Sequence, residues 1–287
     1  MVSAPMLAGA AAVYAQPMEF SSATDMPQAL APAHVLRPDW PAPPQVRALC
    51  TTRQGGVSKP PFASLNLGAW VGDAPSDLAQ NIGLLTATLG APPVFLRQVH
   101  GWALQEIDAQ TEPHRQADGS FTGQTGLACT VGAADCLPIL LCHVRDGRAT
   151  QVGALHAGWR GLAGQDGHGV VEAFFASKAA DGRPPGQWLA WLGPCIGPQA
   201  FEVGPEVRAA FMQAGAQAAA AFTPAPGGKY LAHLPALARQ RLTACGVLQL
   251  YGNDGTPSWC TASNPLRFFS YRRERVTGRQ VAAIALV

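Results

Sequence analysis

Short apolar runs separated by glycine and proline recur along the chain, a pattern typical of strands joined by tight turns. They predict strands over residues 46–51, 94–100, 126–134, 139–144, 149–156, 247–251, 268–271 and 281–287. The chain holds 31 glycines and 25 prolines, and this content favours short strands over a bundle of long helices.

Apolar residues three and four positions apart predict helices between these strands. Leu78, Ile82, Leu85 and Leu89 share one helical face, and Gly90 ends the helix. Further helices are predicted over residues 170–180, 205–222 and 234–244. Strands and helices interspersed in this order predict a mixed-sheet domain of the α/β or α+β class.

One domain is expected to account for most of the chain. Residues 1–40, rich in alanine, proline and serine, are interpreted as a poorly ordered extension, and residues 41–287 as a single catalytic domain. No basic residue precedes Arg37, so the positively charged start of a secretory signal peptide is missing. Seven cysteines scattered through apolar runs favour reduced thiols over a disulfide framework. We therefore expect a cytoplasmic protein.

The charge pattern argues against binding to nucleic acid or to a membrane. Charged residues make up 13% of the chain and the formal net charge is +2. Nucleic acids and anionic membranes attract basic stripes, and the sequence shows none. Beyond the N-terminal extension there is also no apolar run of 18 residues that could span a membrane. Small molecules are the expected partners.

A predicted hairpin brings a cysteine close to a histidine. The dipeptide Asp146–Gly147 lies between two apolar runs, which is a strong signal for a two-residue turn. Pairing the strands outward from this turn places Cys136 opposite Ala157, and Leu137 opposite His156. The thiol and the imidazole are therefore expected side by side at the open end of the hairpin.

This pair allows two chemistries. Cys136 and His156 could form a thiolate–imidazole nucleophile, or they could bind a metal with a third ligand. His100 ends a predicted strand and is the favoured third ligand, with His168 as its rival. Zinc is favoured over copper, because only Met212 could supply an axial ligand in the folded region and there is no His-x-His pair. A buried thiol beside a hydrogen-bonded histidine remains the non-functional alternative.

Two arginines are candidates for binding phosphate. Arg53 precedes two glycines in a loop whose backbone N–H groups could cradle a compact anion, although the loop lacks the lysine of a P-loop. Arg160 follows His156 closely and enters with the same strand end. The basic pair at residues 272–273 could add cationic groups to the site, but a solvated strand end is the favoured interpretation.

Two carboxylates are candidates for moving a proton. Asp135 directly precedes Cys136, and Asp118 stands in an Ala-Asp-Gly turn. Adjacent side chains on a regular strand point to opposite faces, so Asp135 reaches the site only if the strand begins irregularly.

The order of these motifs from about residue 45 to the end resembles that of the YfiH family, whose members were earlier described as polyphenol oxidases or laccase-like proteins. The matching motifs are TTRQGGVS (51–58), SLNLG (64–68), VGD (71–73), QVHG (98–101), ADG (117–119), ADCLP (134–138), HAGWRG (156–161), LGPCIG (192–197), EVG (202–204) and FSYRR (269–273).

The resemblance implies an α+β fold, a mixed-sheet α/β sandwich in a single domain that is grouped with cysteine hydrolases. It also implies a zinc site formed by His100, Cys136 and His156, with Asn66 among the residues that bind substrate or phosphate. The implied activities are phosphorolysis of adenosine, inosine, guanosine and methylthioadenosine, and deamination of adenosine. Nucleoside and inorganic phosphate are then the partners, and we expect a monomer.

Three other functions remain open. A thiol hydrolase or amidase would use Cys136 and His156 without metal. A copper-dependent phenol oxidase would use the same three ligands for a different ion. A binding protein with a structural zinc would need a fourth ligand, and the sequence offers no evident one.

Overall fold

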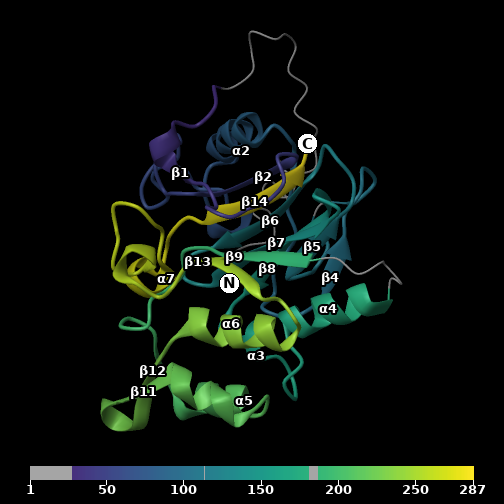
Figure 1. Cartoon of the computed structure of the whole chain (residues 1–287). Helices are drawn as coiled ribbons and strands as arrows, with labels where there is room; N and C mark the ends of the chain where they lie inside the picture. The colour runs from purple at the N-terminus through teal and green to yellow at the C-terminus, as the bar shows by residue number, and fades with distance from the viewer. Residues whose placement is uncertain (1–27, 113, 181–186) are drawn as a thin grey trace.

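The computed structural model describes residues 28–112, 114–180 and 187–287. Two mixed sheets form its centre (Figure 1). The first has the order β1 (Val35–Leu36), β2 (Val46–Thr51), β14 (Gln280–Leu286), β6 (Ala128–Ala133) and β3 (Pro93–Val94). The second has the order β13 (Gln249–Gly252), β9 (Gln187–Leu192), β7 (Leu137–Arg145), β8 (Arg148–Ala157), β5 (Gly119–Thr122) and β4 (Leu104–Glu106).

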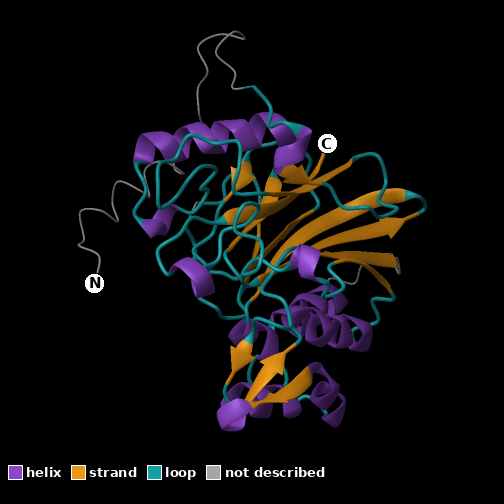
Figure 2. Cartoon of the chain, turned by 90° about the vertical axis from the view of Figure 1, so that its left-hand side faces the viewer, coloured by secondary structure: helices purple, strands orange, loops and turns teal. Residues whose placement is uncertain are grey.

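Helices cover the outer faces of both sheets (Figure 1). Helix α2 (Pro75–Leu89) lies on the first sheet, and α3 (Trp159–Ala163), α4 (Val170–Ala180) and α6 (Leu234–Ala244) lie on the second. A small third sheet, seen with α5 at the bottom of Figure 2, has the order β10 (Glu202–Val203), β12 (Lys229–Ala232), β11 (Phe222–Ala225). The remaining helices are α5 (Pro205–Met212), α7 (Tyr271–Glu274), η2 (Pro32–His34), η3 (Ala69–Val71), η4 (Ala216–Ala221), η5 (Pro226–Gly228) and η6 (Pro257–Trp259).

Three packed cores join these layers into one domain. The core between the two sheets contains Cys50 and Ile284 from the first sheet and Leu140 and Val152 from the second, all fully buried. Alternate residues of the same strands face outward into the helix-covered cores, as the two-residue period of a strand requires. The predicted α+β class and the mixed-sheet sandwich are confirmed.

The predicted N-terminal extension reaches into this domain. Residues 1–27 lie outside the described residues, but residues 28–40 include η2 and β1, and Val35 pairs with Thr51 of β2. Leu30 and Val35 are buried in the core under α2. Because the segment contributes both a strand and apolar side chains, the structure begins the ordered domain before residue 41.

The hairpin of β7 and β8 has the predicted turn but not the predicted register throughout. Arg145 pairs with Arg148 beside the turn as expected. Thr150 is then an extra residue in β8, so that beyond this bulge Pro138, and not Leu137, pairs with His156. Cys136 lies just before the first paired residue of β7, still next to the end of β8.

Three predicted elements differ from the structure. The strand over 94–100 is only two residues long, the strand over 268–271 is replaced by a loop and α7, and the helix over 205–222 ends at Met212. Gly215 breaks that helix with a φ of 149°, a value open to glycine but costly for other residues. Of the helices in the described parts of the chain, none is long and apolar enough to cross a bilayer.

Candidate active site

Three side chains meet beyond the end of the β7–β8 hairpin and form the His–Cys–His cluster, defined as His100, Cys136 and His156. Their ligand atoms all lie within 4.8 Å of one another. His156 is the second-last residue of strand β8, Cys136 directly precedes β7, and His100 comes from the loop after β3. His168, the rival ligand, instead pairs with Gln165 in a separate turn. The predicted trio is brought together.

Asp118 holds the backbone that carries His100. Its carboxylate accepts hydrogen bonds from three consecutive backbone N–H groups, those of Val99 (3.2 Å), His100 (2.8 Å) and Gly101 (2.7 Å). His100 has a φ of 63°, in the left-handed region where a residue other than glycine needs such support. The predicted proton carrier therefore shapes the loop of the first ligand.

Asp118 also orients His156. One carboxylate oxygen lies 2.8 Å from Nδ1 of His156, and both residues are buried. Nδ1 is occupied in this contact, so Nε2 is the nitrogen left for a metal, as in carboxylate–histidine–metal arrangements. Burial would raise the pKa of Asp118, but His156 and the loop N–H groups lower it more. An ionised carboxylate behind the ligand fits a positioning residue better than a proton carrier.

The thiol and the imidazole favour each other's charged forms. Burial would raise the pKa of Cys136, but the charge of His156 and hydrogen bonds from His100 and His156 outweigh this effect and lower the pKa. Burial would lower the pKa of His156, but Cys136 and Asp118 raise it. A thiolate beside an imidazolium is both a competent nucleophile and, once the imidazole loses its proton, a pair of metal ligands.

The cluster fits a catalytic metal. Two imidazole nitrogens and one thiolate sulfur form a three-ligand set of the kind that leaves a fourth position open on zinc. Gly158 keeps the space beside these ligands free, because a Cβ there would lie 3.0 Å from Cys136 Sγ and 3.1 Å from a ring carbon of His100. Among the described residues, this is the one group of three metal-ligating side chains that lie close enough to hold an ion.

A cavity of about 630 Å³ opens at the His–Cys–His cluster. Its wall includes Asp135 and the rings of Trp70, Trp159 and Tyr271. Such a cavity is in the size range of small-molecule sites, and its mixture of flat rings and polar groups suits a heterocyclic ligand.

Asp135 reaches the cavity because the chain turns sharply before β7. Its φ of 101° breaks the strand alternation that would have pointed it away from Cys136. Its carboxylate accepts hydrogen bonds from Thr261 Oγ1 at 2.6 Å and from the backbone N of Arg272 at 2.7 Å. The carboxylate is therefore fixed in the cavity wall.

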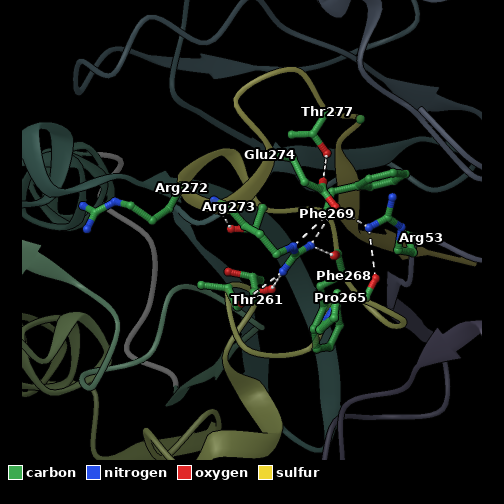
Figure 3. A network of polar contacts seen from close by, with 12 residues as sticks. Arg53, Thr261, Pro265, Phe268, Phe269, Arg272, Arg273, Glu274 and Thr277 are labelled. Atoms are coloured by element: carbon green, nitrogen blue, oxygen red, sulfur yellow. Dashed lines mark hydrogen bonds and ion pairs between the residues drawn. The ribbon is translucent and has the colours of Figure 1, made fainter. Parts of the chain in front are cut away.

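Arg53 is held in a polar network away from the cavity wall (Figure 3). Its guanidinium donates to Glu274 Oε1 at 2.7 Å, to the Pro265 carbonyl at 2.9 Å and to the Ala63 carbonyl at 3.1 Å. It also stacks on the ring of Phe269. The Nε and Nη1 atoms of Arg53, which were expected to bind phosphate, therefore donate within the protein.

Asn66 and Arg160 flank the cavity without lining it. Asn66 is fully buried, donates to Asp73 at 2.8 Å and accepts from the backbone N of Arg279 at 2.9 Å. Arg160 is exposed and lies over the ring of Trp159. Each contacts a residue of the wall, so their influence on a ligand is indirect in this structure.

Sequence reasoning missed the cations that do line the cavity. Arg272, Arg275 and Arg279 belong to the wall, and all come from the segment around α7. In Figure 3 the side chain of Arg272 points away from the Arg53 network. The basic composition of residues 272–279 was the available signal, but assigning the segment to a solvated strand hid it.

Comparisons with known proteins match nearly all of the described chain. Residues 47–287 match the family described as multi-copper polyphenol oxidoreductase laccase. A purine nucleoside phosphorylase from Pseudomonas aeruginosa is 48% identical over 254 residues, covering 88% of this chain and 98% of that protein. The purine nucleoside phosphorylase YfiH of Escherichia coli K12 is 47% identical over 255 residues, covering 88% and 99%.

Solved structures show the same architecture. A Neisseria meningitidis protein of the family DUF152 superposes with a TM-score of 0.78 at 42% identity, covering 88% of this chain and 99% of that one. A YfiH protein from Bacillus licheniformis gives a TM-score of 0.77 at 28% identity, covering 87% and 98%.

Proposed function

The chain belongs to the family described as multi-copper polyphenol oxidoreductase laccase, which includes the YfiH proteins, and we propose that it is a zinc-dependent purine nucleoside phosphorylase. It cleaves adenosine, inosine, guanosine and methylthioadenosine with inorganic phosphate, and deaminates adenosine as a second activity. It acts as a monomer in the cytoplasm, with no nucleic-acid or membrane partner.

The observation that carries this proposal is one cavity whose wall contains both a metal-ligating cluster and arginines. A neutral nucleoside and an anionic phosphate need different surroundings, and the cavity offers both. The rings of Trp70, Trp159 and Tyr271 provide flat apolar surface for a purine. The names of the relatives agree with such a substrate pair.

In this proposal, His100, Cys136 and His156 hold zinc, which supplies Lewis-acid chemistry at the cavity wall when bound. Asp118 keeps His156 in the tautomer that ligates through Nε2. Asp135 is the carboxylate in the wall that can exchange a proton with the purine or with departing ammonia.

Product analysis tests the proposal. Purified, metal-loaded protein is incubated with adenosine or inosine, with and without inorganic phosphate. Phosphate-dependent release of adenine or hypoxanthine is the expected result, together with inosine formed from adenosine. Neither free base nor deaminated product, with the metal content verified, would contradict it.

Two observations favour other chemistry. The pKa shifts of Cys136 and His156 favour the thiolate–imidazolium pair that a thiol hydrolase or amidase needs, and the family description names copper. Metal analysis and chelation distinguish the three functions. Phosphorolysis that a chelator abolishes and zinc restores supports the phosphorylase. Hydrolysis that persists without metal but is lost on alkylation supports the hydrolase. Phenol oxidation that copper alone restores supports the oxidase.

A further inference from the structure

Arg279 is fixed at the cavity wall by its own backbone and by its neighbours. It directly precedes β14, and its backbone N donates to Asn66 Oδ1 at 2.9 Å. Its Nη1 donates to the carbonyls of Thr277 at 2.9 Å and Gly278 at 3.0 Å. The half-buried guanidinium is therefore held in place by hydrogen bonds to two backbone carbonyls.

No carboxylate of the described residues forms an ion pair with Arg279. Within the same part of the chain, its Nε and Nη2 atoms have no hydrogen-bond acceptor. Cys136 and Asp135 share the cavity wall with it, and their negative charges act on its guanidinium. A partly buried guanidinium with free donors is a site for an anion.

Arg275 provides a second cation at the same cavity. Its side chain is exposed, makes no hydrogen bond with the described residues, and lies near the Tyr271 ring with 5.9 Å between guanidinium carbon and ring centre. Its φ of 62° is costly for a residue other than glycine, a feature that clusters at functional sites. Arg272 differs, because its guanidinium donates to the carbonyls of Ala200 and Glu202.

We propose that Arg279, assisted by Arg275, binds inorganic phosphate as the nucleophile of phosphorolysis. This inference rests on the proposed function. A purine nucleoside is neutral and needs no arginine, whereas hydrogen phosphate carries two negative charges that guanidinium groups match in shape and charge. Of the candidates from the sequence, neither Arg53 nor Arg160 belongs to the cavity wall, and Arg53 is paired with Glu274.

The reaction assigns a clear task to these cations. One oxygen of hydrogen phosphate forms a bond to C1′ of the ribose while the bond from C1′ to N9 of the purine breaks. The electron pair of the broken bond goes to the purine, and the proton that hydrogen phosphate gives up balances the proton that the purine gains. Arg279 keeps the dianion beside C1′, and phosphate is thereby favoured over water as the attacking group.

Steady-state kinetics of metal-loaded Arg279→Gln test this assignment, with phosphate and inosine varied separately. The KM for phosphate is expected to rise at least tenfold, while the KM for inosine changes less than threefold. Arg279→Lys, which keeps the charge but not the fork, should recover part of the loss. Arg208→Gln is the matched control, since Arg208 stacks on Tyr230 outside the cavity wall and should leave both constants unchanged.

A second readout needs no turnover. Inorganic phosphate should raise the thermal unfolding midpoint of the wild type and of Arg208→Gln, but much less that of Arg279→Gln. Circular dichroism of each variant verifies the fold. An unchanged phosphate KM in Arg279→Gln, or equal stabilisation by phosphate, would overturn the assignment. Absence of phosphorolysis in the wild type would refute the proposed function alone, and loss of phosphate stabilisation in Arg279→Gln would still support the anion site.

Discussion

At the scale of single residues, the cluster depends on neighbours that are not themselves ligands. Asp118 bonds both to the loop that carries His100 and to the ring of His156, so one buried carboxylate sets the position of two ligands. Gly158 contributes by having no side chain where the ligand atoms of the cluster converge. Metal affinity should therefore respond to changes at either neighbour.

Gly158→Ala is expected to reduce the bound metal to less than a tenth of the wild-type content. Gly158 has φ −64° and ψ 156°, which alanine adopts freely, so only the added methyl group acts. That methyl group would lie 3.0 Å from Cys136 Sγ and force the ligands apart. Elemental analysis after dialysis measures the effect.

Gly132→Ala is the matched control, because its added Cβ meets its neighbours only at 3.6 Å and beyond. Full metal content in Gly158→Ala, with circular dichroism unchanged, would show that the ion is held elsewhere or in another geometry.

At the scale of elements, α7 brings the cavity arginines into place, and the Arg53 network anchors it (Figure 3). Glu274, the last residue of α7, accepts hydrogen bonds from Arg53, Arg273 and Thr277. Arg53 belongs to the loop after β2, so this carboxylate connects two segments more than 200 positions apart. The arginine that was predicted to hold phosphate instead supports the helix beside the proposed phosphate site.

Glu274→Gln is expected to lower the free energy of unfolding by about 1–2 kcal/mol at pH 7, since the ion pairs with Arg53 and Arg273 become hydrogen bonds to an uncharged amide. Burial would raise the pKa of Glu274, but Thr277, Arg53 and Arg273 lower it more. A carboxyl whose pKa is depressed on folding stabilises the protein above its unfolded pKa of about 4.3 and loses this contribution as the pH falls through the folded value.

The difference in the free energy of unfolding between wild type and Glu274→Gln should therefore shrink as the pH falls below about 4.3. Urea unfolding at a series of pH values measures it. Glu106→Gln, at the exposed end of β4, is the control and should behave as the wild type does. A difference that persists unchanged in acid would show that the charge of Glu274 contributes nothing.

Local patterns were sufficient for some elements and for the proximity of the three candidate ligands, but not for the helix predicted over 205–222. Helix α2 and the turn of the β7–β8 hairpin carry strong local signals, and both are confirmed. The bulge at Thr150 was not predictable, because one extra residue in a strand leaves the apolar pattern almost unchanged. The prediction of His–Cys proximity survived, since a slip of one position leaves His156 near Cys136.

The surroundings of the arginines could not be predicted for a different reason. A glycine-rich loop after an arginine resembles an anion site in sequence, but whether its donors are free depends on what packs against it. Glu274 and the Pro265 carbonyl accept hydrogen bonds from Nη1 of Arg53, and both residues lie far along the chain from it. Conversely, nothing near Arg279 in sequence reveals that it shares a cavity wall with Cys136.

At the scale of the whole molecule, the cavity is a product of the complete domain. Its wall is drawn from residues 67–71, 95–100, 132–136, 196–201 and 271–279, among others. The strand ends of both sheets and the loops between them must all be in place for the cluster and the arginines to face one cavity. Segments remote from the cavity therefore contribute to its formation by stabilising the domain.

The segment 28–36 is such a remote contributor. Its Leu30 N–H donates to Thr88 of α2 at 2.8 Å, and the carbonyl of His34 accepts from the backbone N of Thr52 at 2.9 Å. Val35 pairs with Thr51 at the edge of the first sheet, and both Leu30 and Val35 are buried. Thr52 directly precedes Arg53, so the segment also supports the Arg53 network that anchors α7.

A chain that begins at residue 37 is therefore expected to have a free energy of unfolding about 2–4 kcal/mol lower than one that begins at residue 28. It should unfold at a lower urea concentration. Burial of two apolar side chains contributes about 1.5–3 kcal/mol each, and the entropy of ordering the segment offsets part of it. Equal urea midpoints would place the start of the domain near residue 41, as the sequence predicted. A lower free energy of unfolding in the shorter chain alone would show that β1 is part of the folding unit. Removing an edge strand that contributes no stability would leave the urea midpoint unchanged.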